Sequence, residues 1–177
     1  MPASNNTAKK QHYIIFSLWL MMMGIAAAYF ISDRLQPFDP NKLLTAKNST
    51  ALLNEISLLS EFKNTQFKKV IIHITSENCS CTQFSEEHKK SINETALKAG
   101  FAIVNITLPE KLNSIIPSTP AILMLDEMSE LLYFGPYSAG LACTESNGYI
   151  ETVLNNYNMG FSSNLMINDV NGCYCNL

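Results

Sequence analysis

A run of nineteen uncharged residues from Tyr13 to Ile31 constrains the chain more than any other part of its sequence. At a rise of about 1.5 Å per residue, a helix of this length nearly crosses the ~30 Å hydrocarbon core of a bilayer. Charged residues stand on both sides of the run. The sequence therefore predicts a transmembrane helix over residues 13–31, preceded by a short tail at residues 1–12.

A cleaved signal peptide is the alternative interpretation of this run, because Ala26-Ala27-Ala28 resembles a small-residue cleavage site. The apolar run continues to Ile31, however, and exceeds the 7–15 residues of a signal core, which favours an uncleaved anchor. Lysines and arginines are nearly balanced across the segment, so charge indicates its orientation only weakly. Cysteine chemistry favours an oxidising compartment. We therefore expect the N-terminus in the cytoplasm and residues 32–177 to be exported.

Charge and cysteines are distributed unevenly along the chain. The part after residue 31 holds 10 basic and 15 acidic residues, an excess of acid that argues against nucleic-acid binding. All five cysteines also follow the apolar run, and four of them form two Cys-x-Cys pairs, Cys79/Cys81 and Cys173/Cys175. The partners expected from this pattern are protein thiols or disulfides and the membrane, with no nucleic acid and no cofactor.

The sequence after residue 31 predicts an α/β fold with a mixed central sheet and helices on both faces. Residues 32–48 contain two prolines and no periodicity, which is typical of a tether, and residues 160–177 are expected to form a cysteine-containing tail. The folded domain is placed between them, at 49–159. Apolar periodicity and β-branched runs indicate helices at 51–62, 82–99 and 149–157 and strands at 68–75, 101–107, 121–125 and 130–135.

Cys79 and Cys81 stand on the turn between a buried strand and a helix. The N-terminus of a helix carries about half a positive charge and unpaired N–H groups, which stabilise a thiolate. A thiolate is the species that attacks a disulfide, and a second cysteine can then resolve the mixed disulfide. The pair is therefore a candidate redox-active centre.

This order of motifs resembles the thioredoxin superfamily, over about residues 50 to 157. In that family a strand leads to redox cysteines at a helix start, and a cis-proline loop faces them. Thr119-Pro120, 39 residues after Cys81, stands where the family's cis-proline stands, and Gly135 matches its glycine before the last helix. His73, six residues before Cys79, takes the place of the family's buried acidic proton shuttle.

The resemblance implies a thioredoxin-like fold and a membrane-anchored thiol–disulfide oxidoreductase or isomerase. Cys79 would attack, Cys81 would resolve, and His73 would move the proton. Pro120 would shape the substrate groove, and the backbone of Thr119 would pair with an extended peptide. The chain departs from the family in its shorter Cys-x-Cys spacing and in its tail. An anchored domain with both features resembles an uncharacterised bacterial family, which implies the bacterial inner membrane and a periplasmic domain.

Other interpretations of the same residues stay open. Cys173 or Cys175 is expected to bridge Cys143 as a structural disulfide, which leaves one odd thiol. Alternatively, Cys173 and Cys175 form a second redox pair that relays electrons to Cys79 and Cys81. The two Cys-x-Cys pairs, or Cys79 and Cys81 with His73, could hold Zn²⁺ or Cu(I), although zinc sites usually space their cysteines more widely, and no metal ligand is assigned. A non-catalytic binding domain and a plain core role for His73 are further alternatives. His88 is expected on a solvated helix face.

Overall fold

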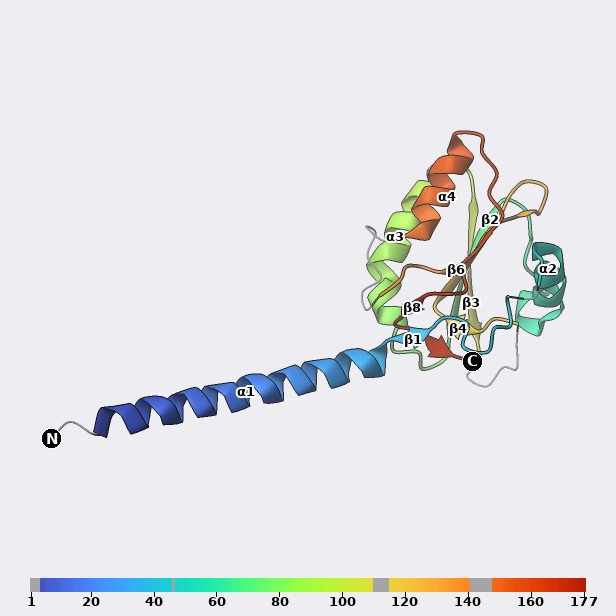
Figure 1. Ribbon diagram of the computed structural model, residues 1–177. Coiled ribbons are helices and arrows are strands. Elements are labelled where there is room, and N and C mark those ends of the chain that lie inside the picture. Colours follow the sequence, from blue (N-terminus) through green and yellow to red (C-terminus); the bar gives the residue numbers. More distant parts are fainter. Residues whose placement is uncertain (1–3, 46, 110–114, 141–147) are drawn as a thin grey trace. The chain divides into compact units, whose positions relative to one another are not determined.

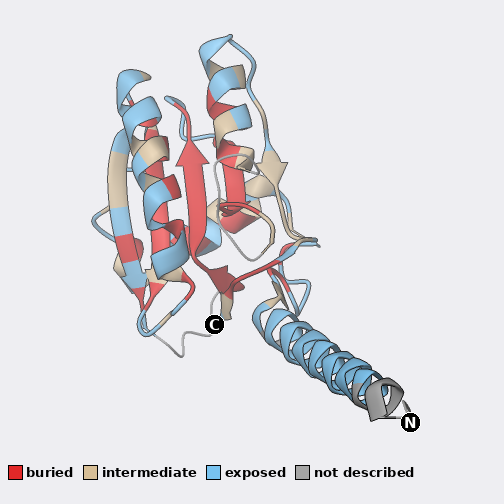
Figure 2. Ribbon diagram, turned by 90° about the vertical axis from the view of Figure 1, so that its left-hand side faces the viewer, coloured by how far each residue is buried: buried red, intermediate tan, exposed pale blue. Residues whose placement is uncertain are grey.

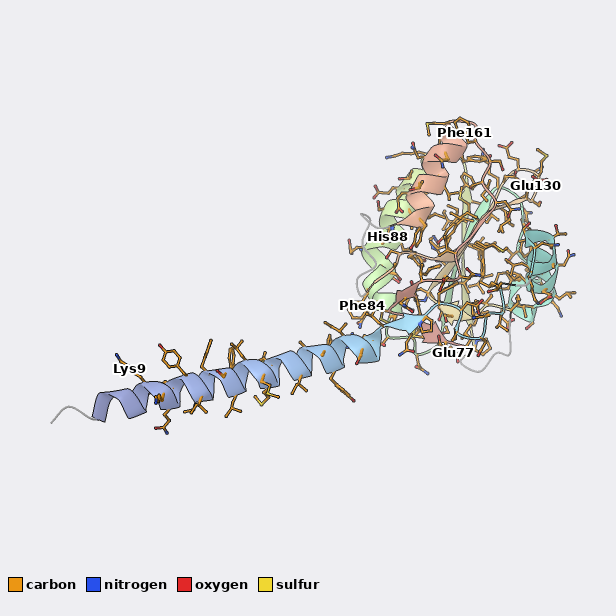
Figure 3. The ribbon with its side chains drawn as sticks, in the orientation of Figure 1. Lys9, Glu77, Phe84, His88, Glu130 and Phe161 are labelled. Atoms are coloured by element: carbon orange, nitrogen blue, oxygen red, sulfur yellow. A yellow bond between two sulfur atoms is a disulfide. The ribbon has the colours of Figure 1, made fainter. Side chains whose placement is uncertain are left out.

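The structure is a computed structural model that describes residues 4–45, 47–109, 115–140 and 148–177. It divides into two compact units, Met1–Arg34 and Leu35–Leu177. The first unit is a single helix, α1 (Ser4–Arg34), in which the stretch Lys9–Ser32 is long and apolar enough to cross a membrane. No side chain of that stretch is buried, and the sticks stand out around the helix axis beyond Lys9 (Figure 3). An N-terminal apolar helix was expected, and it is present.

A five-stranded mixed sheet forms the centre of the second unit, with the strand order β3-β2-β5-β6-β7. Strand β2 runs parallel to β3 and antiparallel to β5, which forms a hairpin with β6, and β7 adds in parallel to β6. The strands are β2 (Val70–Ser76), β3 (Ala102–Leu108), β5 (Ala121–Leu125), β6 (Leu131–Pro136) and β7 (Leu165–Met166). The predicted mixed α/β sheet is confirmed.

Helices cover both faces of this sheet (Figure 1). Helices α3 (Thr82–Lys98) and α4 (Tyr149–Asn158) pack on one face, and α2 (Ser49–Leu58) with the short η1 (Ser60–Phe62) packs on the other. Each helix buries the apolar side of its 3.6-residue period, as Ile150, Val153 and Leu154 show in α4. Gly100, at φ +79°, ends α3 in the left-handed conformation that glycine adopts without steric cost.

Side chains alternate between two apolar cores along the central strands. In β2, Val70, Ile72 and Ile74 face α2, whereas Ile71 faces α3 and α4. Buried residues concentrate on the central strands and on the inner sides of the helices (Figure 2). His73 falls on the same side as Ile71 because side chains alternate along a strand. The core beneath α3 and α4 therefore contains a buried histidine.

The predicted tether at residues 32–48 is wrong from residue 35 onward. Phe38 and Leu44 are fully buried in the core beside α2. The carboxylate of Asp39 accepts hydrogen bonds from the backbone N–H groups of Leu43 and Leu44, both at 2.8 Å, which closes the turn between them. These residues lack periodicity because they form a loop, yet their apolar side chains complete the core.

The predicted tail at residues 160–177 is also part of the folded unit. Besides β7, it forms β8 (Asn171–Gly172), which pairs antiparallel with β1 (Gln36–Pro37), and β9 (Cys175–Asn176), which pairs antiparallel with β4 (Ser118–Thr119). Gly135 allows this approach, because a Cβ there would lie 3.0 Å from the Cβ of Ile167 and 3.1 Å from its carbonyl oxygen. The fold therefore needs the segment that follows α4.

Candidate functional site

The first Cys-x-Cys pair lies where β2 ends and α3 begins, as the sequence predicts. Asn78, at φ +59°, reverses the chain after β2, and the backbone N–H of Cys79 bonds to the carbonyl of Ser76 at 3.4 Å. Cys81 is the N-cap residue of α3, and the first turn of that helix contains no acidic residue. The positive end of the helix dipole is therefore directed at the cysteines without a neighbouring carboxylate in that turn to neutralise it.

Two disulfides join the two Cys-x-Cys pairs to each other. Cys79 bonds to Cys175 with a Cα–Cα distance of 5.8 Å, and Cys81 bonds to Cys173 with a Cα–Cα distance of 5.5 Å. The expected bridge from Cys173 or Cys175 to Cys143 is therefore wrong, and Cys143 itself lies outside the described residues. Equal spacing in two antiparallel segments allows both bridges to form side by side. That matching spacing was the signal that the sequence offered.

The two disulfides differ in their exposure. We call Cys79–Cys175 the outer disulfide, because both of its residues are partly exposed. We call Cys81–Cys173 the inner disulfide, because only 6% of Cys81 and 3% of Cys173 is exposed. A thiol approaching from solvent therefore reaches the outer disulfide first.

The outer disulfide lies against β4, next to the residues that the sequence assigns to a substrate groove. Its Cys79 Sγ is 3.6 Å from the carbonyl oxygen of Thr119, and Thr119 is the strand partner of Cys175. The backbone N–H of Leu177 donates to the carbonyl of Pro117 at 3.1 Å. The Thr119–Pro120 peptide bond is cis. The edge that was expected to pair with a substrate peptide thus pairs with the chain's own β9.

Tyr174, between the two tail cysteines, anchors this segment to the core. It is 4% exposed, its ring meets the ring of Phe38 edge-on at 5.3 Å, and its hydroxyl donates to the carbonyl of Ser138 at 2.7 Å. Beyond it, Cys175 and Leu177 are partly exposed and Asn176 is exposed. The inner disulfide and Tyr174 hold the tail in the core, whereas residues 175–177 are partly or fully exposed and are held by pairing with β4 and by the bond to Pro117.

His73 is a buried histidine with a partner for each ring nitrogen. Its Nε2 lies 2.7 Å from Oδ1 of Asn93, and its Nδ1 lies 2.5 Å from the hydroxyl of Tyr137. An amide oxygen only accepts, so Nε2 carries the proton and Nδ1 accepts from the tyrosine. Burial lowers the pKa of His73 from 6.5 to about 4, which keeps the ring neutral. Both nitrogens are therefore engaged away from the cysteines.

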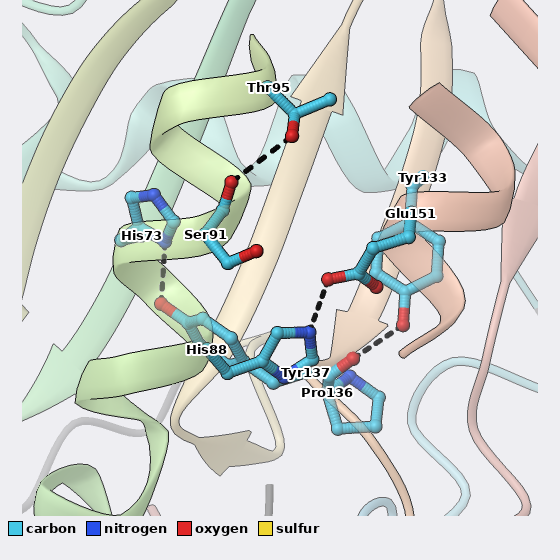
Figure 4. Close-up of polar contacts among 8 residues, drawn as sticks. All are labelled: His73, His88, Ser91, Thr95, Tyr133, Pro136, Tyr137 and Glu151. Atoms are coloured by element: carbon cyan, nitrogen blue, oxygen red, sulfur yellow. Dashed lines mark hydrogen bonds and ion pairs between the residues drawn. The ribbon is translucent and has the colours of Figure 1, made fainter. Parts of the chain in front are cut away.

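A second buried histidine corrects the prediction of a solvated helix face. His88 in α3 is 1% exposed, and its Nε2 pairs with the carboxylate of Glu151 in α4. Figure 4 shows the His88 ring directed at Glu151 and the His73 ring directed at Tyr137. The ring of Tyr137 contacts both histidine rings, at centroid distances of 5.6 Å and 5.9 Å. We call His73, His88, Asn93, Tyr137 and Glu151 the histidine cluster.

The cysteines form a compact group of sulfur atoms, which we call the sulfur cluster. The Sγ atoms of Cys79, Cys81 and Cys175 lie within 4.8 Å of one another, and Cys173 joins the group through its bond to Cys81. Such proximity permits exchange of bonds between neighbouring sulfurs, and it also suits a metal ion when the sulfurs are reduced. The sequence prediction grouped Cys79 and Cys81 with His73 for redox chemistry and, as an alternative, joined the two Cys-x-Cys pairs around a metal. The structure brings the two pairs together and gives His73 other partners.

The chain belongs to the family described as Domain of unknown function (DUF6436), whose model matches residues 47–177. That range contains both Cys-x-Cys pairs and the residues of the histidine cluster. No curated protein and no solved structure matches the chain. The family assignment therefore covers most of the folded unit and assigns it no activity.

Proposed function

We propose that this protein is a membrane-anchored thiol–disulfide oxidoreductase whose reactive bond is the outer disulfide. The observation that carries the proposal is the position of Cys79–Cys175: partly exposed, just before the N-terminus of α3, and lying along the edge of β4. Exposure gives access to a partner's thiol. The helix N-terminus stabilises the thiolate that exchange creates, which makes cleavage of this bond easier.

A thioredoxin-like arrangement is part of the proposal. Its support is the sequence of elements β2–α3–β3 followed by the β5–β6 hairpin and α4, with cysteines between β2 and α3. Pro120 precedes β5, and the carbonyl of the residue before it lies 3.6 Å from Cys79 Sγ. These are the relations that the superfamily uses to place a substrate beside its cysteines. The second Cys-x-Cys pair is this chain's own addition.

The exchange runs in two balanced steps with a partner protein that presents two thiols. The first partner thiolate attacks Sγ of Cys79, the bond to Cys175 breaks, and Cys175 leaves as a thiolate. The second partner thiolate attacks the partner sulfur of the mixed disulfide, and Cys79 leaves as a thiolate. Two electrons pass to the chain, the partner gains a disulfide, and the two protons from its thiols end on Cys79 and Cys175 or in solvent. The same steps in reverse reduce a partner disulfide.

Cys175 takes the resolving role that the sequence prediction gave to Cys81. Because the inner disulfide remains closed, the tail stays anchored at Cys173 and Tyr174 while residues 175–177 move off β4. The backbone of Thr119 is then free to pair with an extended partner peptide, as β9 pairs with it in the disulfide form. His73 has no part in this scheme, since each of its ring nitrogens already has a partner.

The proposed location is the bacterial inner membrane, with the folded unit on the periplasmic side. Support comes from the apolar length of α1 and from the two disulfides, which persist in an oxidising compartment. An anchor would hold the sulfur cluster near other membrane-bound partners. Labelling of single cysteines introduced at either end of α1, compared with the chain that lacks them, tests this orientation in intact cells.

The test compares two matched variants of the detergent-solubilised full chain. Cys79→Ser/Cys175→Ser removes the outer disulfide, and Cys81→Ser/Cys173→Ser removes the inner one, each without leaving an unpaired cysteine in the cluster. The assay follows oxidation of a peptide dithiol, with glutathione disulfide as the terminal oxidant. We expect loss of the outer disulfide to lower the protein-dependent rate at least 100-fold, and loss of the inner one to change it less than about threefold. Equal rates for both variants and the wild type would refute the proposal.

A further inference from the structure

We infer that the reduced sulfur cluster is a binding site for one thiophilic cation, held by Cys79, Cys81 and Cys175. Their three Sγ atoms lie within 4.8 Å of one another, although Cys175 is far from the other two along the chain. Zinc–sulfur bonds are about 2.3 Å long, so two sulfurs on one ion stand about 3.8–4.0 Å apart. A disulfide holds its two sulfurs about 2.0 Å apart, so Cys79 and Cys175 need to separate by about 2 Å after reduction to reach that spacing.

Charge gives the reduced cluster a reason to bind a cation. Reduction of both disulfides by an excess of a dithiol or a phosphine takes four electrons and leaves four thiols, of which Cys81 is only 6% and Cys173 only 3% exposed. Two or three thiolates so close together repel one another, and burial adds a desolvation cost. The N-terminus of α3 offsets about half a charge. A bound cation neutralises the remainder and makes the fully deprotonated state accessible.

The ligand set selects the kind of ion. Sulfur ligands favour Zn²⁺ and Cu(I) over Mg²⁺ and Ca²⁺, which prefer oxygen. His73, once considered as a ligand beside Cys79 and Cys81, is engaged with Asn93 and Tyr137 instead. Cys173, bonded to Cys81 in the disulfide form, is the fourth sulfur within reach. Four sulfurs suit tetrahedral Zn²⁺, and three suit Cu(I).

Such a site would keep the tail in place when the disulfides are reduced. Cys79 and Cys81 belong to the α3 turn, and Cys175 belongs to β9, so one ion would join the two segments that the disulfides join. The disulfide form offers no thiolate and cannot bind. Metal binding thus requires that both disulfides be open, whereas the proposed exchange opens only the outer one.

The test measures metal retention by the full chain in detergent, with Zn²⁺ and Cu(I) as separate probes. Protein reduced with a phosphine is loaded with each ion, passed over a chelating resin, and analysed by native mass spectrometry. We expect one ion per reduced chain and none per oxidised chain. We further expect Cys79→Ser and Cys175→Ser to weaken affinity for the retained ion at least 100-fold. Affinity is measured in the reduced state, because there the wild type and the variants alike have no disulfide.

Cys143→Ser is the matched control, since Cys143 is in neither disulfide, and it should bind as the wild type does. If Cys173→Ser loses Zn²⁺, the zinc site has four sulfur ligands. If the same variant retains Cu(I), the copper site has three. No ion on the reduced wild type, or equal binding by Cys79→Ser and Cys175→Ser, overturns the inference. The inference and the proposed function fail separately. One ion per reduced chain from a protein that shows no exchange keeps the inference and refutes the function, and exchange by a protein whose reduced chain holds no ion does the reverse.

Discussion

The sulfur cluster and the histidine cluster lie in the same folded unit and are built on opposite principles. The sulfur cluster has a partly exposed side and is held by two covalent bonds between segments far apart in sequence. In the histidine cluster the rings of His73, His88 and Tyr137 are buried, and hydrogen bonds and ring contacts hold the cluster together. The sequence places His73 only six residues before Cys79, yet in the fold His73 bonds to Asn93 and Tyr137, whereas Cys79 bonds to Cys175.

This difference teaches that proximity in sequence does not make one site. A buried, fully partnered histidine is suited to hold the packing between β2 and α3, because every change in its protonation costs hydrogen bonds. A partly exposed disulfide next to a helix N-terminus is suited to chemistry, because its bonds can be exchanged without opening the core. The histidine cluster therefore serves stability, and the outer disulfide of the sulfur cluster serves reactivity.

The largest expected effect concerns the nested disulfides. Closing a loop of 96 or 92 residues stabilises the folded state by about 5 kcal/mol through chain entropy, but a second bridge beside the first closes only about six further residues and adds about 2 kcal/mol. Removing either disulfide alone should thus cost about 2 kcal/mol. Replacing all four cysteines by serine should cost about 7 kcal/mol, well above the sum of the two.

Urea unfolding of the detergent-solubilised chain, followed by the near-ultraviolet circular dichroism of its tyrosines, measures these free energies. A cost of about 5 kcal/mol for one disulfide and almost nothing for the other would show that they do not form together. No comparable excess over the sum of single costs is expected for substitutions in the histidine cluster, because none of its contacts closes a covalent loop.

The second effect is a pH dependence that belongs to the histidine cluster. The folded chain holds His73 neutral down to a pKa of about 4, whereas the unfolded chain takes up the proton near pH 6.5. Between these values the free energy of unfolding should fall as the pH drops, by about 1.4 kcal/mol per unit and about 3 kcal/mol in all. Below pH 4 this contribution should level off.

His73→Gln is the control for that experiment, because it removes the titrating ring and should remove this part of the slope. The same variant should keep its exchange rate within about threefold of the wild type. A large loss of exchange in His73→Gln would join the two clusters into one site and contradict their separation.

The smallest effects come from a matched pair of hydroxyl deletions. Tyr137→Phe leaves Nδ1 of His73 buried without its donor, which should cost about 2 kcal/mol. Tyr174→Phe removes the bond to the carbonyl of Ser138, which should cost about 1 kcal/mol and speed reduction of the inner disulfide. Equal costs in the same unfolding assay, with no change in that reduction rate, would mean that Tyr174 does not anchor the tail.

Much of the fold is predictable from the sequence because its elements are encoded locally. The β-branched run of β2, the apolar period of α4 and Gly100 at the end of α3 each carry their own signal, and the structure places all three as predicted. The position of Cys79 and Cys81 between strand and helix follows from the same local patterns. Each of these signals is carried by residues that lie within about four positions of one another along the chain.

The missed features depend on contacts between distant residues. Phe38 and Leu44 are single apolar residues in a proline-containing loop, and no periodicity marks them as core. Strands β8 and β9 are two residues each, too short for an alternating pattern. His88 lies beside two glutamates in sequence, but its partner Glu151 is on another helix. Pairing among five cysteines has many solutions, and the fold selects one.

Partial reduction followed by alkylation tests the central claim most directly. The oxidised full chain is exposed to limiting dithiol, quenched with an alkylating reagent, and the modified cysteines are located by fragmentation in the mass spectrometer. We expect Cys79 and Cys175 to be modified first and together, while Cys81 and Cys173 remain linked. Joint early modification of Cys79 and Cys81, or of Cys81 and Cys173, would contradict it.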